Sequence, residues 1–368
     1  MELTVRIKVS VFMIIVISIL MLLPAYNYFM VEKPLKDVTL LGKIQRLYNM
    51  DAIEGELAYL AFKAGISVEP NKVIIGKGGW LFLGNEYANT LVAKRDGVNA
   101  TTAPAITSLH DAMHEWKKYL TDQGVQYFMV TVGPDKDTIY SDHLPAWTTH
   151  ADASIIKKIL DDNSDIYIDT LSALQAEKNR SSTPLYFYTD THWNHYGAAV
   201  VFNLLRNVIK DDEVAWQKLF SENDFAVEKG TGGDLAAFLR TAKISDIKVN
   251  IKSEEINNLN IRKVDYQTGK EISTERMTTV EAPTVPTLII SDNALSNKKV
   301  LWLRDSFGNA MSPFMSREFK EILQVHHGRV TPTLMKQMVA SFKPDYVIIT
   351  VVERDALTSF FTSPPSWG

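Results

Sequence analysis

The chain has 368 residues, enough for one large domain or two smaller ones with a sizeable core. Apolar residues make up 46% and charged residues 22%, as in an ordinary globular protein, and the formal net charge is −4. There is no basic stripe, so we expect no nucleic-acid partner. The absence of cysteine excludes thiol nucleophiles, disulfides and cysteine-ligated zinc, and it fits an oxidising compartment.

The N-terminus carries a strongly apolar run. Val9–Leu23 has no charge, and with the residues up to Met30 it reaches the roughly 20 residues that span a bilayer. Arg6 and Lys8 precede the run, which predicts a cytoplasmic N-terminus. We therefore expect residues 1–30 to form a cytoplasmic tip and a transmembrane signal-anchor in the bacterial inner membrane, with residues 31–368 in the periplasm. The alternative is a cleaved signal peptide and a soluble periplasmic protein.

The elements up to residue 178 follow from hydrophobic periodicity. Apolar residues at helical spacing predict helices at 40–62, 104–124, 154–161 and 171–178, and apolar runs predict strands at 125–132 and 166–168. Between the first two helices, Val73–Leu83 contains two short apolar segments around a glycine-rich turn, which indicates a hairpin. A phosphate-binding loop is the alternative there, but the spacing is wrong and no Ser or Thr follows the lysine.

The stretch Tyr186–Gly197 reads Y-F-Y-T-D-T-H-W-N-H-Y-G: an aromatic, strand-like run that ends in Asp190 and His192 and precedes a helix at about 196–209. Two residues apart on an extended backbone, these two side chains can point the same way. The carboxylate can then fix the imidazole tautomer and raise its basicity. This pair predicts two members of a nucleophile-activating triad.

The remainder divides into two parts. Residues 211–297 are polar and alternate like strands at 247–251 and 287–290, which indicates a β-rich insertion. An α/β pattern follows, with strands expected at 299–303, 322–325 and 346–352 and helices at 307–315 and 333–342. Apolar strands separated by helices are typical of a parallel sheet that is covered on both faces.

A nucleophile is expected at Ser306. The segment L-W-L-R-D-S-F-G ends an apolar strand in Asp-Ser and continues into a helix. This junction lies at the carboxyl edge of a parallel sheet, where α/β proteins place their chemistry, and helix N-terminal N–H groups can stabilise an oxyanion. The alternative is a serine that only caps the helix.

The D-T-H-W and R-D-S-F-G segments, in this order, resemble the periplasmic alginate O-acetyltransferases of the AlgJ/AlgX kind, which belong to the SGNH, or GDSL-like, hydrolase superfamily. Residues 76–82, 233–235 and 352–354 also resemble segments of that family. The resemblance implies an SGNH hydrolase-like three-layer α/β fold with a central parallel sheet and permuted motifs. It implies Ser306 as nucleophile, His192 as general base and Asp190 as the residue that orients it.

The oxyanion hole is less defined, because Arg304 stands where the superfamily has glycine; Arg304, Trp193 and Gly133 are candidate substrate or oxyanion contacts. Ser306 N–H is the expected first donor and the Gly133 region a candidate second. Trp193 is expected either to stack on a sugar or to pack beside the histidine. Asp190, His192 and His195 could instead ligate a metal, although His195 is expected to be a solvated turn residue. No metal or cofactor is expected.

The function that follows is O-acetyl transfer through an acetyl-serine to hydroxyls of an exopolysaccharide such as alginate. The resemblance implies a membrane-bound O-acyltransferase as the acetyl donor. Two alternatives remain: a carbohydrate acetylesterase with the same triad, and a non-catalytic subunit of an exopolysaccharide export or acetylation complex.

Overall fold

The computed structural model describes residues 2–30, 39–162, 164–209, 219–276 and 279–367. A seven-stranded mixed sheet forms the centre of the molecule, and its strands stand in the order β3-β11-β9-β10-β8-β6-β7. These strands are β3 (Tyr127–Gly133), β11 (Tyr346–Val352), β9 (Ser296–Arg304), β10 (Phe319–His326), β8 (Thr287–Ser291), β6 (Asn260–Asp265) and β7 (Glu271–Arg276). Two further pairs are antiparallel: β1 (Val73–Ile75) with β2 (Leu81–Leu83), and β4 (Phe225–Thr231) with β5 (Ser245–Ile251).

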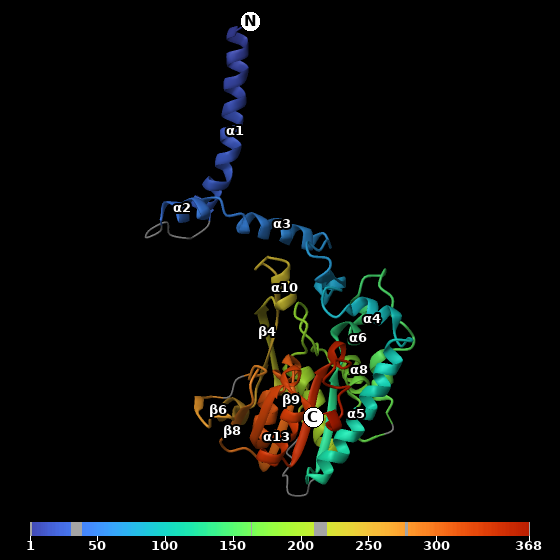
Figure 1. The fold of residues 1–368 in the computed structure, drawn as a ribbon. Coiled ribbons are helices and arrows are strands. Elements are labelled where there is room, and N and C mark those ends of the chain that lie inside the picture. Colours follow the sequence, from blue (N-terminus) through green and yellow to red (C-terminus); the bar gives the residue numbers. More distant parts are fainter. Residues whose placement is uncertain (1, 31–38, 163, 210–218, 277–278, 368) are drawn as a thin grey trace.

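The thirteen helices of the described residues are α1 (Glu2–Met30), α2 (Leu40–Leu47), α3 (Asp51–Lys63), α4 (Thr90–Asp96), α5 (Thr102–Asp122), α6 (Lys136–Ile139), α7 (Ile155–Leu160), α8 (Thr170–Arg180), α9 (His195–Val208), α10 (Asp234–Phe238), α11 (Glu254–Asn257), α12 (Ser312–Glu318) and α13 (Pro332–Phe342). Figure 1 shows α1 projecting from the rest of the molecule, with α2 and α3 between it and the sheet.

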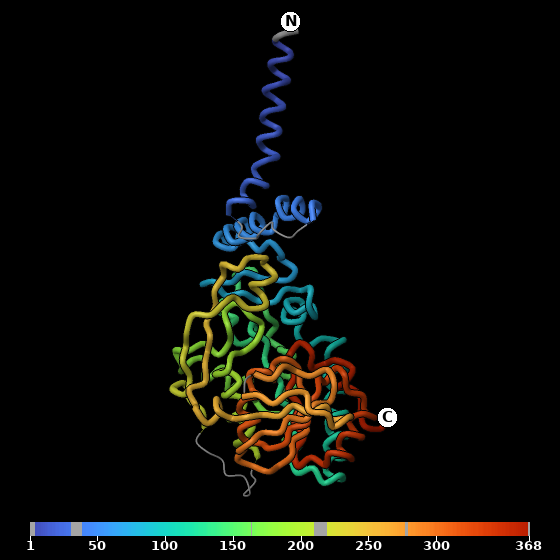
Figure 2. Tube along the Cα trace, turned by 90° about the vertical axis from the view of Figure 1, so that its left-hand side faces the viewer, coloured from blue at the N-terminus to red at the C-terminus, as the bar shows by residue number. Residues whose placement is uncertain are grey.

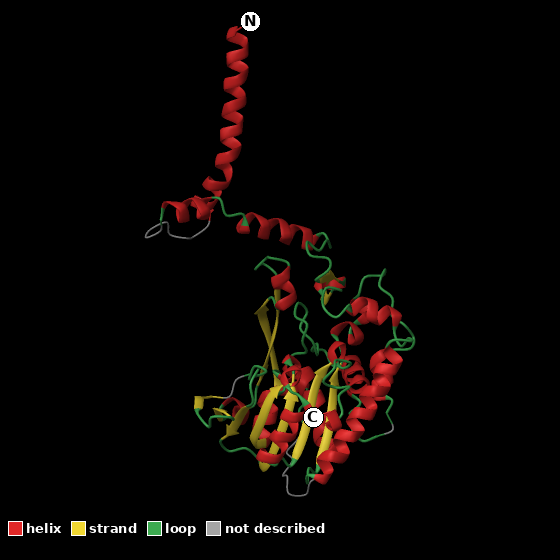
Figure 3. Cartoon of the chain, viewed as in Figure 1, coloured by secondary structure: helices red, strands yellow, loops and turns green. Residues whose placement is uncertain are grey.

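The sheet has helices on both faces, so the expected three-layer α/β fold is confirmed. Strands β3, β11, β9 and β10 are parallel to one another, and β8, β6 and β7 extend the sheet in antiparallel fashion. Chain order and right-handed crossovers place α8, α9 and α12 on one face and α13 on the other. The expected β-rich insertion therefore supplies three strands of the main sheet (Figure 3).

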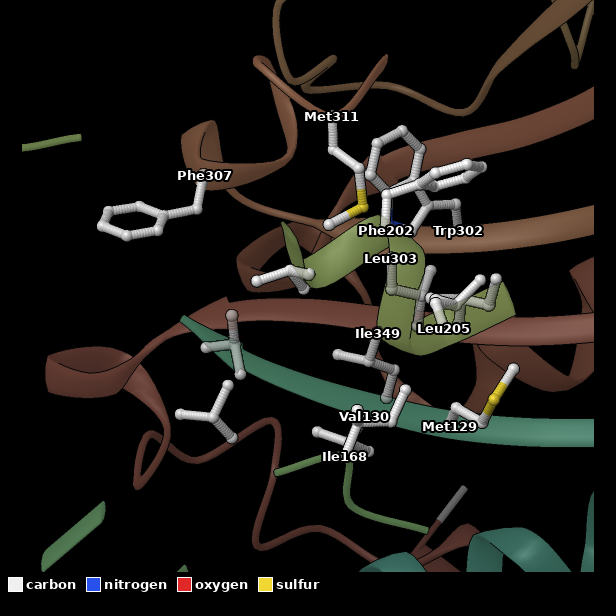
Figure 4. Close-up of a cluster of buried hydrophobic side chains, with 14 of the residues drawn as sticks. Met129, Val130, Ile168, Phe202, Leu205, Trp302, Leu303, Phe307, Met311 and Ile349 are labelled. Carbon is white, nitrogen blue, oxygen red and sulfur yellow. The ribbon is translucent and has the colours of Figure 1, made fainter. Parts of the chain in front are cut away.

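The core lies between the sheet and these helices. Met129, Val130 and Ile349 come from adjacent parallel strands, and Phe202 and Leu205 come from α9 (Figure 4). All of these side chains are buried. Strands that are covered on both faces need no polar alternation, which explains why β11 is an apolar run with Thr350 as its one polar residue.

Two expected helices differ in the structure, and the strand expected at 166–168 is a single bridge between Val130 and Tyr167. The helix expected at 40–62 is interrupted, because Asn49 Oδ1 accepts the Asp51 N–H (2.6 Å) and begins a new helix, α3. The helix expected at 307–315 is a 3-10 turn, η4 (Ser306–Gly308), followed by α12, which has Pro313 in its first turn. The predicted domain boundaries near residues 31 and 211 fall on 31–38 and 210–218, outside the described residues.

Candidate active site

Ser306 stands where β9 ends, at the carboxyl edge of the sheet. The preceding residue, Asp305, is buried and holds this end in place. Its Oδ1 accepts the Phe307 N–H (2.8 Å) and its Oδ2 accepts the N–H of Val352 at the end of β11 (2.7 Å). Ser306 is thereby fixed at the first position of η4, half-buried, and its own N–H has no hydrogen-bond partner among the described residues.

Asp190, His192 and Ser306 form one hydrogen-bonded chain. The Nε2 atom of His192 lies 2.7 Å from Ser306 Oγ, and its Nδ1 atom lies 2.7 Å from Asp190 Oδ1. The same carboxylate oxygen accepts the His192 backbone N–H (3.0 Å). The side chains of Asp190 and His192 are 22% and 26% exposed, so the chain of groups is reachable from solvent. The distances are those that a nucleophile, a base and an orienting acid require.

The segment that carries Asp190 and His192 is a loop, so the expected strand-like run is wrong. It forms one isolated bridge, between Tyr186 and Trp193. The loop is held instead by the ammonium group of Lys136, a residue that is only 4% exposed.

Lys136 Nζ donates to three carbonyl oxygens of this loop: Phe187 (3.2 Å), Tyr188 (3.1 Å) and Asp190 (2.6 Å). One lysine thus satisfies three backbone acceptors of the loop, and Tyr188 O also accepts the N–H of Leu81 in β2 (2.8 Å). Its own pKa is lowered to about 8, because burial disfavours the charged form more strongly than the surrounding carboxylates favour it.

A second carboxylate, Asp234 on α10, lies beside the pair. Its backbone N–H donates to Asp190 Oδ2 (3.1 Å), and its Oδ2 lies 3.9 Å from His192 Nδ1. Thr191 donates to both Asp234 oxygens, from its N–H (2.8 Å) and its hydroxyl (2.6 Å). Gly233 permits this approach, since a Cβ there would lie 2.3 Å from the Asp190 Cβ. Asp234 was missed as a site residue, although Gly233-Asp234-Leu235 stood out in the sequence.

The two carboxylates differ in electrostatics. Burial raises the pKa of Asp190, but the hydrogen bond and positive charge of His192 outweigh it and lower that pKa to about 2. Burial lowers the pKa of His192, and the hydrogen bond and charge of Asp190 more than offset this, so the net pKa is raised. The pKa of Asp234 is raised by burial and by the charge of Asp190.

The oxygen and nitrogen atoms of Asp190, His192 and Asp234 lie within 4.8 Å of one another, close enough to hold a metal ion. Both ring nitrogens of His192 are already engaged, however, by Asp190 and Ser306. The cluster suggested by the sequence is not formed, because His195 begins α9 and its Nδ1 lies 3.0 Å from the Ala310 carbonyl oxygen. His195 is half-buried there, which corrects the expectation of a solvated turn residue.

Arg354 adds a positive charge to the site. It follows β11 in the turn η6 (Glu353–Asp355), and its guanidinium is paired with Asp135. The guanidinium carbon lies 5.7 Å from the centre of the Phe307 ring, and the side chain is 17% exposed. Its charge acts on His192, whose pKa it lowers. Arg354 had no expected role in the site, since only tertiary structure brings it over the Phe307 ring.

Two expected substrate contacts are wrong. Trp193 is fully buried, and its Nε1–H donates to the Phe307 carbonyl (2.7 Å), so it packs beside the histidine and cannot stack on a sugar. Arg304 is fully buried as well. Its guanidinium donates to Gln324 Oε1 (2.7 Å), Asn309 Oδ1 (2.7 Å), Val280 O (2.7 Å) and Asp305 O (3.3 Å). It therefore supports the turn from inside.

Gly133 ends β3 underneath the site. A Cβ at this position would lie 2.6 Å from the Phe307 ring and 3.0 Å from the Trp193 ring. Glycine is therefore required at this position by packing. Two histidines, His326 and His327, stand where β10 ends. His327 is buried, and its Nε2 lies 3.5 Å from Asp305 Oδ2.

Comparisons with known proteins agree with this geometry. The sheet brings Ser306 and His192 together at its carboxyl edge, an arrangement that several unrelated classes of α/β enzyme share. The family model of the SGNH hydrolase-like domain of the acetyltransferase AlgX matches residues 73–284, so the chain belongs to that family and to the SGNH hydrolase-like class. The expected AlgJ/AlgX-like relationship is thus confirmed. Family membership makes the chain an O-acetyltransferase, of the general class that modifies polysaccharides. Ser306 and Arg354 lie outside the matched range.

Solved structures show the same fold at low sequence identity. PatB1 of Bacillus cereus is 15% identical, with a TM-score of 0.57 over 78% of this chain and 98% of that one. A DHHW family protein from Eubacterium siraeum is 16% identical, with a TM-score of 0.54 over 79% of this chain and 96% of that one. The O-acetyltransferase domain of Pseudomonas putida AlgJ is 17% identical, with a TM-score of 0.46 over 80% and 96%. No curated protein matches the sequence.

Proposed function

We propose that this protein transfers acetyl groups through an acetyl-Ser306 intermediate to hydroxyls of an exopolysaccharide such as alginate. The observation that carries the proposal is the continuous hydrogen-bonded chain from Asp190 through His192 to Ser306. His192 Nε2 takes the Ser306 proton while Oγ attacks the carbonyl carbon of the acetyl donor. Asp190 holds the Nδ1–H and stabilises the imidazolium.

The first tetrahedral intermediate collapses when the leaving group departs with the proton from Nε2, which leaves the acetyl-serine. An acceptor hydroxyl then gives its proton to Nε2 and attacks the acetyl carbon. Ser306 departs and recovers the proton, so the enzyme is regenerated unchanged.

Charge on the carbonyl oxygen is stabilised by two groups in this proposal. The Ser306 N–H points from the start of η4 without another partner among the described residues. Arg354, held by Asp135, supplies the positive charge at the same end of the sheet. Preorganised donors of this kind need no rearrangement as the charge develops.

The N-terminal helix supports a location at the membrane. Thr4–Met30 is long and apolar enough to cross a bilayer, and its most apolar window is 6% buried within the molecule. A signal sequence would meet the same description. We propose that it anchors the domain in the inner membrane, on the periplasmic side, where a membrane-bound O-acyltransferase presents the acetyl group.

The test is acetyl partition by the full chain in lipid nanodiscs, supplied with an activated acetyl ester with and without alginate. We expect acetylated polymer when alginate is present. When alginate is omitted, we expect one acetyl group (about 42 Da) on Ser306, and this adduct should be absent from Ser306→Ala. Acetate release that is unaffected by alginate, with no acetylated polymer, would instead identify an acetylesterase. Polymer acetylation that persists in cells carrying Ser306→Ala would make the protein a non-catalytic subunit.

A further inference from the structure

Helix α2 has one apolar face without a partner among the described residues. The sequence L-L-G-K-I-Q-R-L places its apolar side chains at helical spacing and Lys43 and Arg46 on the opposite side. None of its residues is buried. The most exposed members of this face and of the turn that follows are Leu40 (76%), Leu41 (66%), Ile44 (47%) and Tyr48 (47%).

Helix α3 is apolar on two opposite sides. Tyr59 and Phe62 pack against a small core formed by the β1–β2 hairpin and α10. Leu57 and Leu60, on the other side, are 59% and 63% exposed. The Tyr59 and Phe62 side meets the part of the molecule that holds the sheet and the active site, called the catalytic body below. The Leu57 and Leu60 side therefore faces away from it. A surface helix of a soluble protein needs only one apolar side, so the second requires a separate explanation.

Helices α2 and α3 are joined to the end of the candidate membrane span by hydrogen bonds. Asn27 in α1 donates from Nδ2 to the carbonyl oxygens of Leu47 (2.8 Å), at the end of α2, and of Asn49 (2.7 Å), between α2 and α3. Figures 1 and 2 show α2 and α3 running across the axis of α1, at its end and ahead of the catalytic body. This is the position at which a spanning helix leaves a bilayer.

We propose that α2 and α3 lie on the periplasmic surface of the membrane. The outer apolar face, defined as Leu40, Leu41, Ile44, Tyr48, Leu57 and Leu60, sits among the lipid headgroups and upper acyl chains. Lys43 and Arg46 stay in the aqueous and headgroup region, as in other helices that lie in the interface plane. This inference rests on the anchoring role proposed for α1.

The arrangement orients the active site as well as tethering it. Glu54 and Glu56 of α3 pair with Arg240 (3.6 Å) and Lys243 (2.6 Å), just after α10. Helix α10 begins with Asp234, which lies beside His192. The helix that rests on the lipid is therefore connected to the segment that borders the catalytic pair. The site is held close to the membrane surface, where a membrane-bound acetyl donor would arrive.

The chain contains no cysteine, so single-cysteine variants can be spin-labelled without removing native thiols. The full chain is placed in nanodiscs of phosphatidylethanolamine and phosphatidylglycerol. Labels are introduced by Ile44→Cys, Leu57→Cys and Leu60→Cys, with Lys43→Cys and Gln45→Cys as aqueous controls. Collision with oxygen, which concentrates in lipid, is compared with collision with a water-soluble nickel chelate.

We expect the three apolar positions to favour oxygen several-fold over the two controls. Nickel accessibility at positions 44, 57 and 60 equal to that at 43 and 45 would overturn the proposal. Low accessibility to both reagents would also overturn it, because a protein partner or a second copy would then cover the face. A label at Ile15→Cys in α1 distinguishes failure of the anchor from failure of the surface position of α2 and α3. If this label is not in lipid, α1 does not anchor the protein. The chemistry of Ser306 is tested separately, by acetyl partition.

Discussion

His192 lies between two carboxylates, and only one of them has the geometry to fix its tautomer. Asp190 Oδ1 is 2.7 Å from Nδ1, whereas Asp234 Oδ2 is 3.9 Å away and is engaged by the Thr191 hydroxyl. Asp190 therefore orients the ring, and Asp234 contributes charge and holds the loop.

This difference predicts two distinct pH profiles. The raised pKa of His192 means that activity, which needs the neutral imidazole, rises with pH through a midpoint above the usual value for histidine. Asp190→Asn removes the main cause of that rise, so the acid limb of kcat/KM moves to lower pH. The rate also falls by about 10⁴-fold, because the ring is no longer held in the productive tautomer.

Asp234→Asn is the matched comparison. It keeps an oxygen for the Thr191 N–H, and it removes one negative charge near the imidazole. We expect a smaller shift of the acid limb in the same direction and a rate loss below about tenfold. Equal rate losses in the two variants would contradict the separation of roles.

Arg354 is predicted to act on both charge stabilisation and pH dependence. Arg354→Gln should lower kcat/KM by about 10²- to 10³-fold, the usual loss for one oxyanion donor. Since the cation lowers the His192 pKa, its removal should move the acid limb to higher pH, opposite to Asp190→Asn. The exposed Arg329 offers the control, Arg329→Gln. A fall in stability with an unmoved acid limb would indicate a purely structural role.

At the residue scale, the sequence predicts the parts of the site that depend on local patterns. An Asp-x-His pair and an Asp-Ser at a strand end are each readable within a few residues. Asp234 and Arg354 lie far along the chain from both motifs. The residues that flank them in the sequence do not indicate which side chains they meet in the fold. Trp193 and Arg304 were assigned to substrate because burial of an aromatic or a guanidinium group depends on the whole fold.

At the scale of elements, Lys136 is one of several residues that hold the loop from Tyr186 to His192, beside Asp234 and Asp246. Lys136→Met removes a donor from three partly buried carbonyl oxygens, of which Tyr188 O keeps the Leu81 N–H. We expect the free energy of unfolding to fall by about 3 kcal/mol, since each acceptor left without a donor carries a desolvation penalty. Urea denaturation of the purified full chain measures it.

The control for this variant is Lys118→Met on the exposed face of α5, which should change the unfolding free energy by less than about 0.5 kcal/mol. If Lys136→Met behaves like the control, the loop is held by other contacts.

The type and bounds of an element were predictable where burial of apolar side chains determines them. Strand β11 has the bounds expected for it, Tyr346–Val352, because every residue is buried and all except Thr350 are apolar. The run Tyr186–Tyr188 has the aromatic composition of a strand, yet the Phe187 and Tyr188 carbonyl oxygens accept from a lysine side chain, and the Tyr188 oxygen also accepts the N–H of Leu81 in β2 (2.8 Å). Composition cannot distinguish the two partners.

At the scale of the whole molecule, the sequence predicts the layers but not how residues 260–291 join them. Strand β8 pairs antiparallel with β10, which lies some distance further along the chain, and β6 pairs with β8. Such pairings depend on contacts between distant segments. A segment with weak alternation and many charges therefore resembles a separate patch until its partner strand is known.

The attachment of α3 to the catalytic body gives a prediction at this scale. Arg240→Asn with Lys243→Gln removes three ion pairs, two from Arg240 to Glu54 and Glu69 and one from Lys243 to Glu56. Asparagine tolerates the left-handed backbone at position 240 (φ 56°). We expect the unfolding free energy to change by less than about 1 kcal/mol. The distance between spin labels at Leu60→Cys and Lys320→Cys should become more broadly distributed.

The parent chain with the same two labels is the control. An unchanged distance distribution would show that the apolar packing of Tyr59 and Phe62 alone fixes the helix.

The position of β11 has a consequence for how the enzyme matures. It is the last strand in the chain, yet it lies between β3 and β9. As the chain is synthesised from its N-terminus, β3 and β9 are complete before their shared neighbour, and Asp305 gains its bond from the Val352 N–H last. The segment of chain between β3 and β11 is long, so bringing these two strands together is late and entropically costly. The geometry around Ser306 is therefore completed only in the final stage of folding.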